Sequence, residues 1–103
     1  MSPIESLRRD QLTARVAAAN RAANLALEHL RVRGIDASLI GSLKSGGFGL
    51  DSDIDFLVTR CPAKLVYTVE AELADIMGEF QFDVIYLSRV PEDKRERWLA
   101  HAR

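Results

Sequence analysis

The spacing of hydrophobic residues predicts one long helix at the start of the chain. Between residues 2 and 33, apolar side chains recur at steps of three and four, which is typical of a helix with a single apolar stripe. The stripe consists of Leu12, Val16, Ala19, Ala23, Leu27 and Leu30. Ser2, Pro3 and Glu5 suit an N-cap, a first helical position and a capping box. Gly34 then predicts the end of the helix.

The rest of the chain alternates short apolar runs with helical patterns. We expect strands at residues 35–40, from about 53 to 58 and at 82–87. A second amphipathic helix is expected over residues 63–79, and a last helix opens at Pro91. We expect Trp98 and Leu99 of that last helix to pack on the sheet.

Residues 41–55 connect the first two predicted strands and carry the candidate chemistry. Glycines crowd the front of this run, while Asp53 and Asp55 stand at its end. Alternate residues of a strand point to the same face, so these two carboxylates are expected side by side. Such carboxylates repel each other unless they bind a cation, and Mg²⁺ prefers oxygen ligands. Because glycines let a backbone approach phosphate closely, the run predicts a site for a nucleoside triphosphate.

Other interpretations of this run fit less well. Residues 51–55 resemble the opening of an EF-hand loop, but Phe56 and Pro62 occupy the positions where that loop needs glycine and glutamate. A P-loop would need lysine where Gly47 stands. A glycine-rich hairpin with a solvated acidic end remains as the alternative without chemistry.

The pair Gly41-Ser42, ten further residues and then Asp53-Ile54-Asp55 resemble the signature of the DNA polymerase β-like nucleotidyltransferases. The short length resembles the minimal nucleotidyltransferases, a prokaryotic branch of that superfamily. The resemblance extends from about residue 35 to about residue 87.

From the residues and this resemblance together, we expect an α/β (α+β) fold with a small mixed sheet of about three strands flanked by helices. At 103 residues, the chain is expected to form one nucleotidyltransferase domain. Residues 1–34 would form the long N-terminal helix, residues 35–90 the catalytic core and residues 91–103 the C-terminal helix.

The resemblance also implies metal ligands. Asp53 and Asp55 would hold two Mg²⁺ ions, and a third carboxylate from a later strand would complete the second metal site. Asp83 is the acidic residue placed for that role, and its alternative is a surface position on an edge strand. A carboxylate on the otherwise apolar face of a strand needs a partner.

The implied reaction is transfer of AMP from ATP to a hydroxyl group, with release of pyrophosphate. Gly41 and Ser42 would bind the phosphates of ATP. Lys44 would neutralise triphosphate charge or, alternatively, remain a solvated surface residue.

Composition limits the kinds of partner that we expect the chain to bind. A net charge of −1 gives no strong nucleic-acid signal, and no apolar run approaches the roughly 18 residues that span a membrane. A polar N-terminus and the single residue Cys61 lead us to expect a cytoplasmic protein.

The acceptor is inferred from the resemblance alone. Minimal nucleotidyltransferases resemble antitoxins that pair with a HEPN-type ribonuclease toxin and, in some systems, modify it with AMP. We expect the long first helix to extend beyond the sheet and meet a protein partner or a second copy. The alternative to catalysis is a nucleotide-binding or toxin-neutralising module that acts by complex formation.

Overall fold

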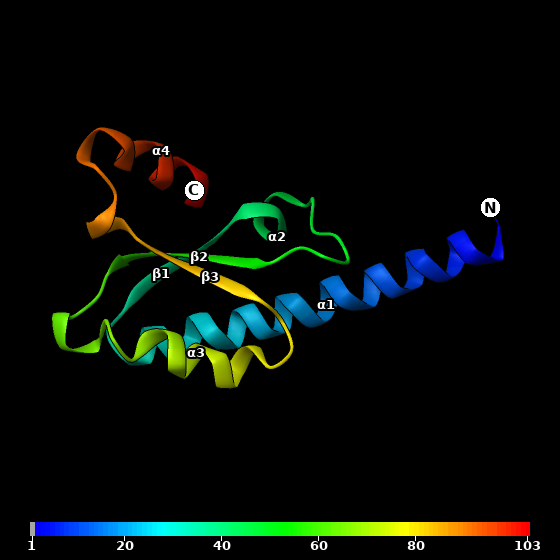
Figure 1. The fold of residues 1–103 in the computed structure, drawn as a ribbon, viewed down its shortest axis with the longest axis horizontal. Coiled ribbons are helices and arrows are strands. Elements are labelled where there is room, and N and C mark those ends of the chain that lie inside the picture. Colours follow the sequence, from blue (N-terminus) through cyan, green and yellow to red (C-terminus); the bar gives the residue numbers. More distant parts are fainter. Residues whose placement is uncertain (1) are drawn as a thin grey trace.

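The structure is a computed structural model that describes residues 2–103. The elements are α1 (Pro3–Val32), β1 (Asp36–Ile40), α2 (Gly41–Ser45), β2 (Ile54–Arg60), η1 (Ala63–Leu65), α3 (Val69–Met77), β3 (Phe82–Tyr86), η2 (Leu87–Arg89) and α4 (Glu92–Ala102). The strands form one sheet in the order β1-β2-β3, in which β1 runs antiparallel and β3 parallel to β2. The expected α+β fold, with a three-stranded mixed sheet and a long N-terminal helix, is confirmed (Figure 1).

Helix α1 begins and ends where the sequence predicts. The Ser2 hydroxyl accepts a hydrogen bond from the Glu5 backbone N–H at 3.1 Å, and the Ser2 N–H donates to the Glu5 carboxylate at 3.4 Å. This capping box satisfies two N–H groups that a helix start otherwise leaves without partners. Gly34, just beyond the helix, has a φ of +79°, a conformation that glycine adopts without steric strain.

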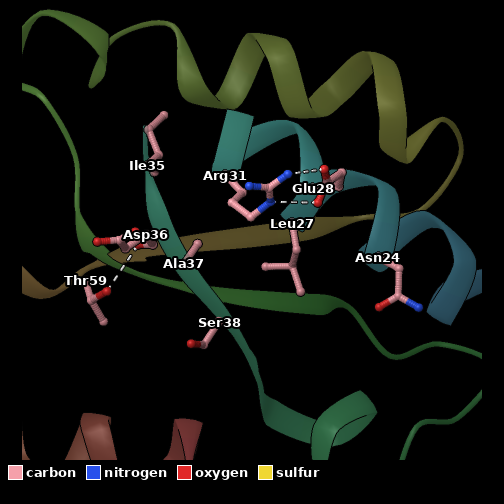
Figure 2. Close-up of a pocket in the computed structure, with 9 residues that line it drawn as sticks. All are labelled: Asn24, Leu27, Glu28, Arg31, Ile35, Asp36, Ala37, Ser38 and Thr59. Carbon is pink, nitrogen blue, oxygen red and sulfur yellow. Dashed lines mark hydrogen bonds and ion pairs between the residues drawn. The ribbon is translucent and has the colours of Figure 1, made fainter. Parts of the chain in front are cut away.

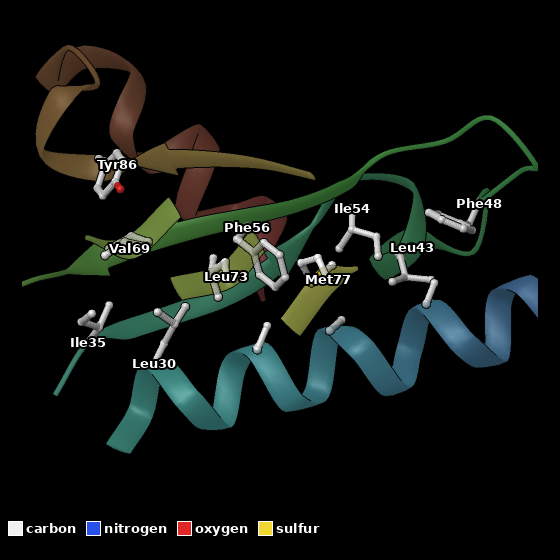
Figure 3. Close-up of a cluster of buried hydrophobic side chains, with 14 residues drawn as sticks. Leu30, Ile35, Leu43, Phe48, Ile54, Phe56, Val69, Leu73, Met77 and Tyr86 are labelled. Atoms are coloured by element: carbon white, nitrogen blue, oxygen red, sulfur yellow. The ribbon is translucent and has the colours of Figure 1, made fainter. Parts of the chain in front are cut away.

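The hydrophobic core lies between α1, α3 and one face of the sheet (Figure 3). Its fully buried members from the helices and strands include Ala19, Ala23, Ala26, Leu30, Ile54, Phe56, Val69 and Leu73. Residues alternate across a strand, so Asp55 and Leu57 of β2 point to the opposite face. Helix α4 lies on that opposite side of the sheet and contacts β1 (Figure 1).

The prediction of the second helix is wrong about where that helix begins. Residues 63–79 form the short turn η1 and then α3, which starts only at Val69. The Thr68 hydroxyl donates to the Leu65 carbonyl at 3.0 Å and to the Glu72 carboxylate at 2.8 Å. Such side-chain bonds to nearby backbone compete with helix formation, which accounts for the interruption.

The glycine-rich run also differs from the expected simple connection. Its first five residues form the short helix α2, and β2 begins at Ile54 rather than at Asp53. The Ile54 N–H donates to the Gln81 carbonyl at 2.9 Å, and this bond starts the pairing of β2 with β3. Asp53 therefore precedes the strand and is not a member of it.

Candidate functional site

Two of the predicted carboxylates lie directly opposite each other in the sheet. In the parallel pairing of β2 with β3, Asp55 is in register with Asp83. Phe56 and Val84, the next pair, belong to the face that packs on the core, so the two aspartates share the other face. The residue numbers 55 and 83 differ by 28, so the sheet register brings together two residues that lie far apart in the chain.

Gly41 packs against one of these carboxylates. Ile40, at the end of β1, is in register with Asp55, and Gly41 follows it with a φ of +76°. A Cβ atom at position 41 would collide with an Asp55 carboxylate oxygen and would lie 3.1 Å from its Cγ. Glycine is therefore required here both by its backbone angle and by the closeness of the carboxylate.

The charges at this site perturb one another. Partial burial raises the pKa of Asp55, and the negative charges of Asp83 and then Asp53 raise it further. Asp55 is half-buried, whereas Asp53 and Asp83 are exposed. The three predicted metal ligands thus form one acidic site beside Gly41, in which ionisation of Asp55 is opposed by its two neighbours.

The donor chemistry of this site fits Mg²⁺. Three carboxylates offer only oxygen ligands, and a divalent cation would offset their mutual repulsion. Within residues 2–103, however, no group of three or more His, Cys, Asp or Glu side chains is already gathered closely enough to hold a metal ion. Binding would require the exposed side chains of Asp53 and Asp83 to turn toward Asp55.

The other predicted binding residues lie on α2, which follows Gly41 directly. Ser42 is half-buried, and its carbonyl accepts hydrogen bonds from the N–H groups of Gly46 and Gly47, both at 2.9 Å. These bonds end the helix and turn the chain back toward β2. Lys44 is exposed, which agrees with its alternative interpretation as a surface residue. The same exposure leaves its amine accessible to a ligand.

One residue that supports this region is not evident from the sequence. The guanidinium of Arg15 on α1 lies 4.9 Å from the ring centre of Phe80 and 5.8 Å from that of Phe48. Phe48 is buried and belongs to the loop between α2 and β2, so this cation–π contact ties the loop to α1. Arg15 is one of several arginines on α1, and no sequence signal separates it from those on the surface.

A separate cavity of about 320 Å³ lies between α1 and β1 (Figure 2). Some of its polar groups already have partners: Glu28 forms an ion pair with Arg31 at 2.6 Å, and the Thr59 hydroxyl donates to the Asp36 carbonyl at 3.2 Å. Asp36 begins β1, whereas Ile40 ends it beside the acidic site. The residues of β1 that line the cavity are Asp36, Ala37 and Ser38, so the cavity lies toward the end of the strand that is away from the acidic site.

Comparison with models of known protein families, with curated proteins and with solved structures finds no match to this chain. Among residues 2–103, no helix is both long and apolar enough to cross a membrane.

Proposed function

We propose that this chain is a Mg²⁺-dependent nucleotidyltransferase that transfers AMP from ATP to a hydroxyl group of a partner protein. The main support is the sheet register that sets Asp55 opposite Asp83, with Gly41 against the Asp55 carboxylate. A purely structural explanation has difficulty with this arrangement, because like charges opposite each other in a sheet destabilise it.

The three carboxylates have distinct roles in this proposal. Asp53 and Asp55 would hold the Mg²⁺ that accompanies the triphosphate, and Asp83 would complete the second metal site and help to take the proton of the acceptor hydroxyl. Bound Mg²⁺ would supply charge stabilisation to the oxygens that attack and leave the α-phosphorus. A bond then forms between the acceptor oxygen and the α-phosphorus, the bond from this phosphorus to the bridging oxygen breaks, and pyrophosphate leaves.

The other site residues bind the nucleotide. The backbone beside Gly41 and the Ser42 hydroxyl hold the terminal phosphates, and glycine at position 41 leaves room for the Asp55 carboxylate beside them. Lys44, which is exposed on α2, would offset part of the negative charge of the triphosphate.

An exposed stripe on α1 supports a helical protein partner. Residues 3–11 of α1 are all exposed, so the first part of the helix extends beyond the core (Figure 1). The radius of gyration is accordingly 15.2 Å, against about 13 Å for a compact domain of this size. Exposed apolar residues nevertheless continue along one side of this helix, namely Ile4 (66% exposed), Leu7 (58%), Leu25 (64%) and Val32 (71%).

The spacing of this stripe matches that of helices that pair. Ile4, Gln11, Ala18, Leu25 and Val32 recur every seven residues, and Leu7 and Ala14 fall between them at steps of three and four. A seven-residue repeat of this kind packs against another helix. A helical toxin of the HEPN type is the partner that we propose, and a second copy of this chain is the alternative.

The same stripe favours a second candidate function, neutralisation of the partner by complex formation without catalysis. The test begins with the protein that co-purifies with a tagged chain from its source cells. The Asp53→Ala/Asp55→Ala double variant should still bind this partner but should fail to control its activity. If the variant both binds the partner and controls it fully, catalysis is not the function and the second candidate replaces it.

A further inference from the structure

One side of α4 is basic and aromatic, and it is not part of the acidic site. Lys94, Arg97, Trp98 and His101 are spaced at i, i+3, i+4 and i+7, so they share one side of the helix. They line a cavity of about 270 Å³. The rings of Trp98 and His101 lie 6.2 Å apart between their centres, at an angle of 43°.

The two cations of this cavity are available to a ligand. Other basic residues in this part of the chain have structural partners: Arg95 of α4 donates to the Val90 carbonyl at 2.9 Å, and Arg103, just beyond α4, pairs with Glu96 at 3.0 Å. Within the part of the chain that the structure describes, neither Lys94 nor Arg97 makes a side-chain hydrogen bond or an ion pair. Their charges therefore contribute to no contact that holds the fold together.

Two of the three acidic residues of α4 lie away from this cavity, whereas the third, Asp93, stands four positions before Arg97. Glu92 and Glu96 are four positions apart, and helical geometry places both nearly opposite to Lys94 and His101. Lys94 and Arg97 line the cavity together with Trp98, and no acidic residue is among its lining. The net charge of the whole chain is −1, so an excess of positive charge at this cavity is local.

We propose that this side of α4 binds a nucleotide unit, with the base stacked on Trp98 and the phosphates held by Lys94 and Arg97. An aromatic ring binds the flat face of any base, and ammonium and guanidinium groups bind phosphate. The cavity is slightly smaller than the roughly 300 Å³ at which ligand pockets begin, so it holds one base while the phosphates extend over the rim. The unit is either a free mononucleotide or the end of a nucleic-acid strand.

Helix α4 and the acidic site of the proposed transferase are on the same side of the sheet. The helix lies on the face of the sheet to which Asp55 and Asp83 point, and it contacts β1, whose last residue is in register with Asp55. The cavity itself is lined by α4 alone, and the ATP donor of the proposed function is held elsewhere, at Gly41, Ser42 and Lys44. Binding itself does not depend on the acidic site, so the two proposals can fail separately.

Trp98 is the only tryptophan in the chain, so its fluorescence reports on this site directly. The experiment titrates the intact protein with ATP, AMP and a ten-residue single strand of deoxyadenosine, in EDTA and with excitation at a wavelength that nucleotides do not absorb. We expect saturable quenching by ATP that is about tenfold weaker or more in the Lys94→Ala/Arg97→Ala variant, because two charge-assisted contacts to phosphate are lost. The matched control, Arg8→Ala/Arg9→Ala on the exposed start of α1, should bind as the wild type does.

The outcomes distinguish a mononucleotide from a strand end as the ligand, and they test this nucleotide site separately from the proposed transferase function. Tighter binding of the strand than of ATP identifies a strand end as the ligand, and the reverse identifies a mononucleotide. Absence of quenching by all three probes, equal quenching in the Lys94→Ala/Arg97→Ala variant, or equal quenching by a short polyglutamate overturns the inference. An Asp53→Ala variant that quenches normally but transfers nothing supports both proposals, whereas quenching in a wild type that never transfers AMP leaves this site intact and removes the proposed function.

Discussion

Replacement of Gly41 by alanine tests the geometry of the acidic site without any assumption about its chemistry. The new Cβ would stand in a left-handed conformation at φ +76° and would collide with the Asp55 carboxylate. Gly34 provides a matched control, because its φ is +79° but no atom lies within 4 Å of the position that a Cβ would take. The two substitutions therefore share the backbone strain and differ in the collision.

The expected magnitudes follow from these two effects. A non-glycine residue in the left-handed region is destabilised by roughly 1–2 kcal/mol, which is the whole effect expected for Gly34→Ala. Overpacking adds about 1–3 kcal/mol, so Gly41→Ala should lower the free energy of unfolding by roughly 2–5 kcal/mol. For a domain of this size the additional collision corresponds to a fall in Tm of at least about 4 °C beyond that of the control.

Urea unfolding of both variants, each repeated in an Asp55→Ala background, measures the collision as a coupling energy. Removal of the carboxylate should bring the effect of Gly41→Ala close to that of Gly34→Ala, with a coupling of about 1–3 kcal/mol. Equal effects of the two glycine substitutions in the wild-type background, or a coupling near zero, would refute the close contact between Gly41 and Asp55.

Three further predictions follow from the same contacts. At pH 7 Asp83→Asn should raise the free energy of unfolding by up to about 1 kcal/mol, since it removes a like charge opposite Asp55; Asp75→Asn, an exposed control on α3, should change it by less than about 0.5 kcal/mol. Because the pKa of Asp55 is raised above its ordinary 3.8, its contribution to stability is present below that pH and is lost as the pH rises through the folded-state value. Urea unfolding measured from pH 3 upward should therefore show that the free energy of unfolding of Asp55→Asn rises relative to that of the wild type. A difference between the two proteins that stays constant with pH would contradict the raised pKa of Asp55. Ile4→Glu combined with Leu7→Glu should abolish partner binding in a pull-down while the thermal midpoint stays within about 3 °C, because both side chains are exposed.

Local features of this fold could be predicted from the sequence because their causes are local. The capping box of Ser2 and Glu5 needs only residues three apart, and it forms as expected. Strand alternation likewise put Asp83 on the face opposite to Phe82 and Val84, and the packing of those two residues on the core agrees with this.

Long-range features could not be predicted in this way. The sequence suggested that Asp83 belongs near Asp55, but the register that sets them opposite each other depends on how β2 and β3 pair. The contact between Gly41 and Asp55 depends in the same way on the pairing of β1 with β2. The late start of α3 reflects hydrogen bonds of Thr68, which a hydrophobic pattern does not reveal.

The measurement that tests the central proposal most directly uses ATP labelled on its α-phosphate. The purified chain is incubated with this ATP and Mg²⁺, with and without the partner that co-purifies from its source cells, and label on protein is measured after denaturing electrophoresis. We predict label on the partner that disappears in EDTA and in the Asp53→Ala variant. Absence of label from a partner that remains in complex with the chain, while calorimetry detects bound ATP, would contradict nucleotidyl transfer and identify the chain as a binding module.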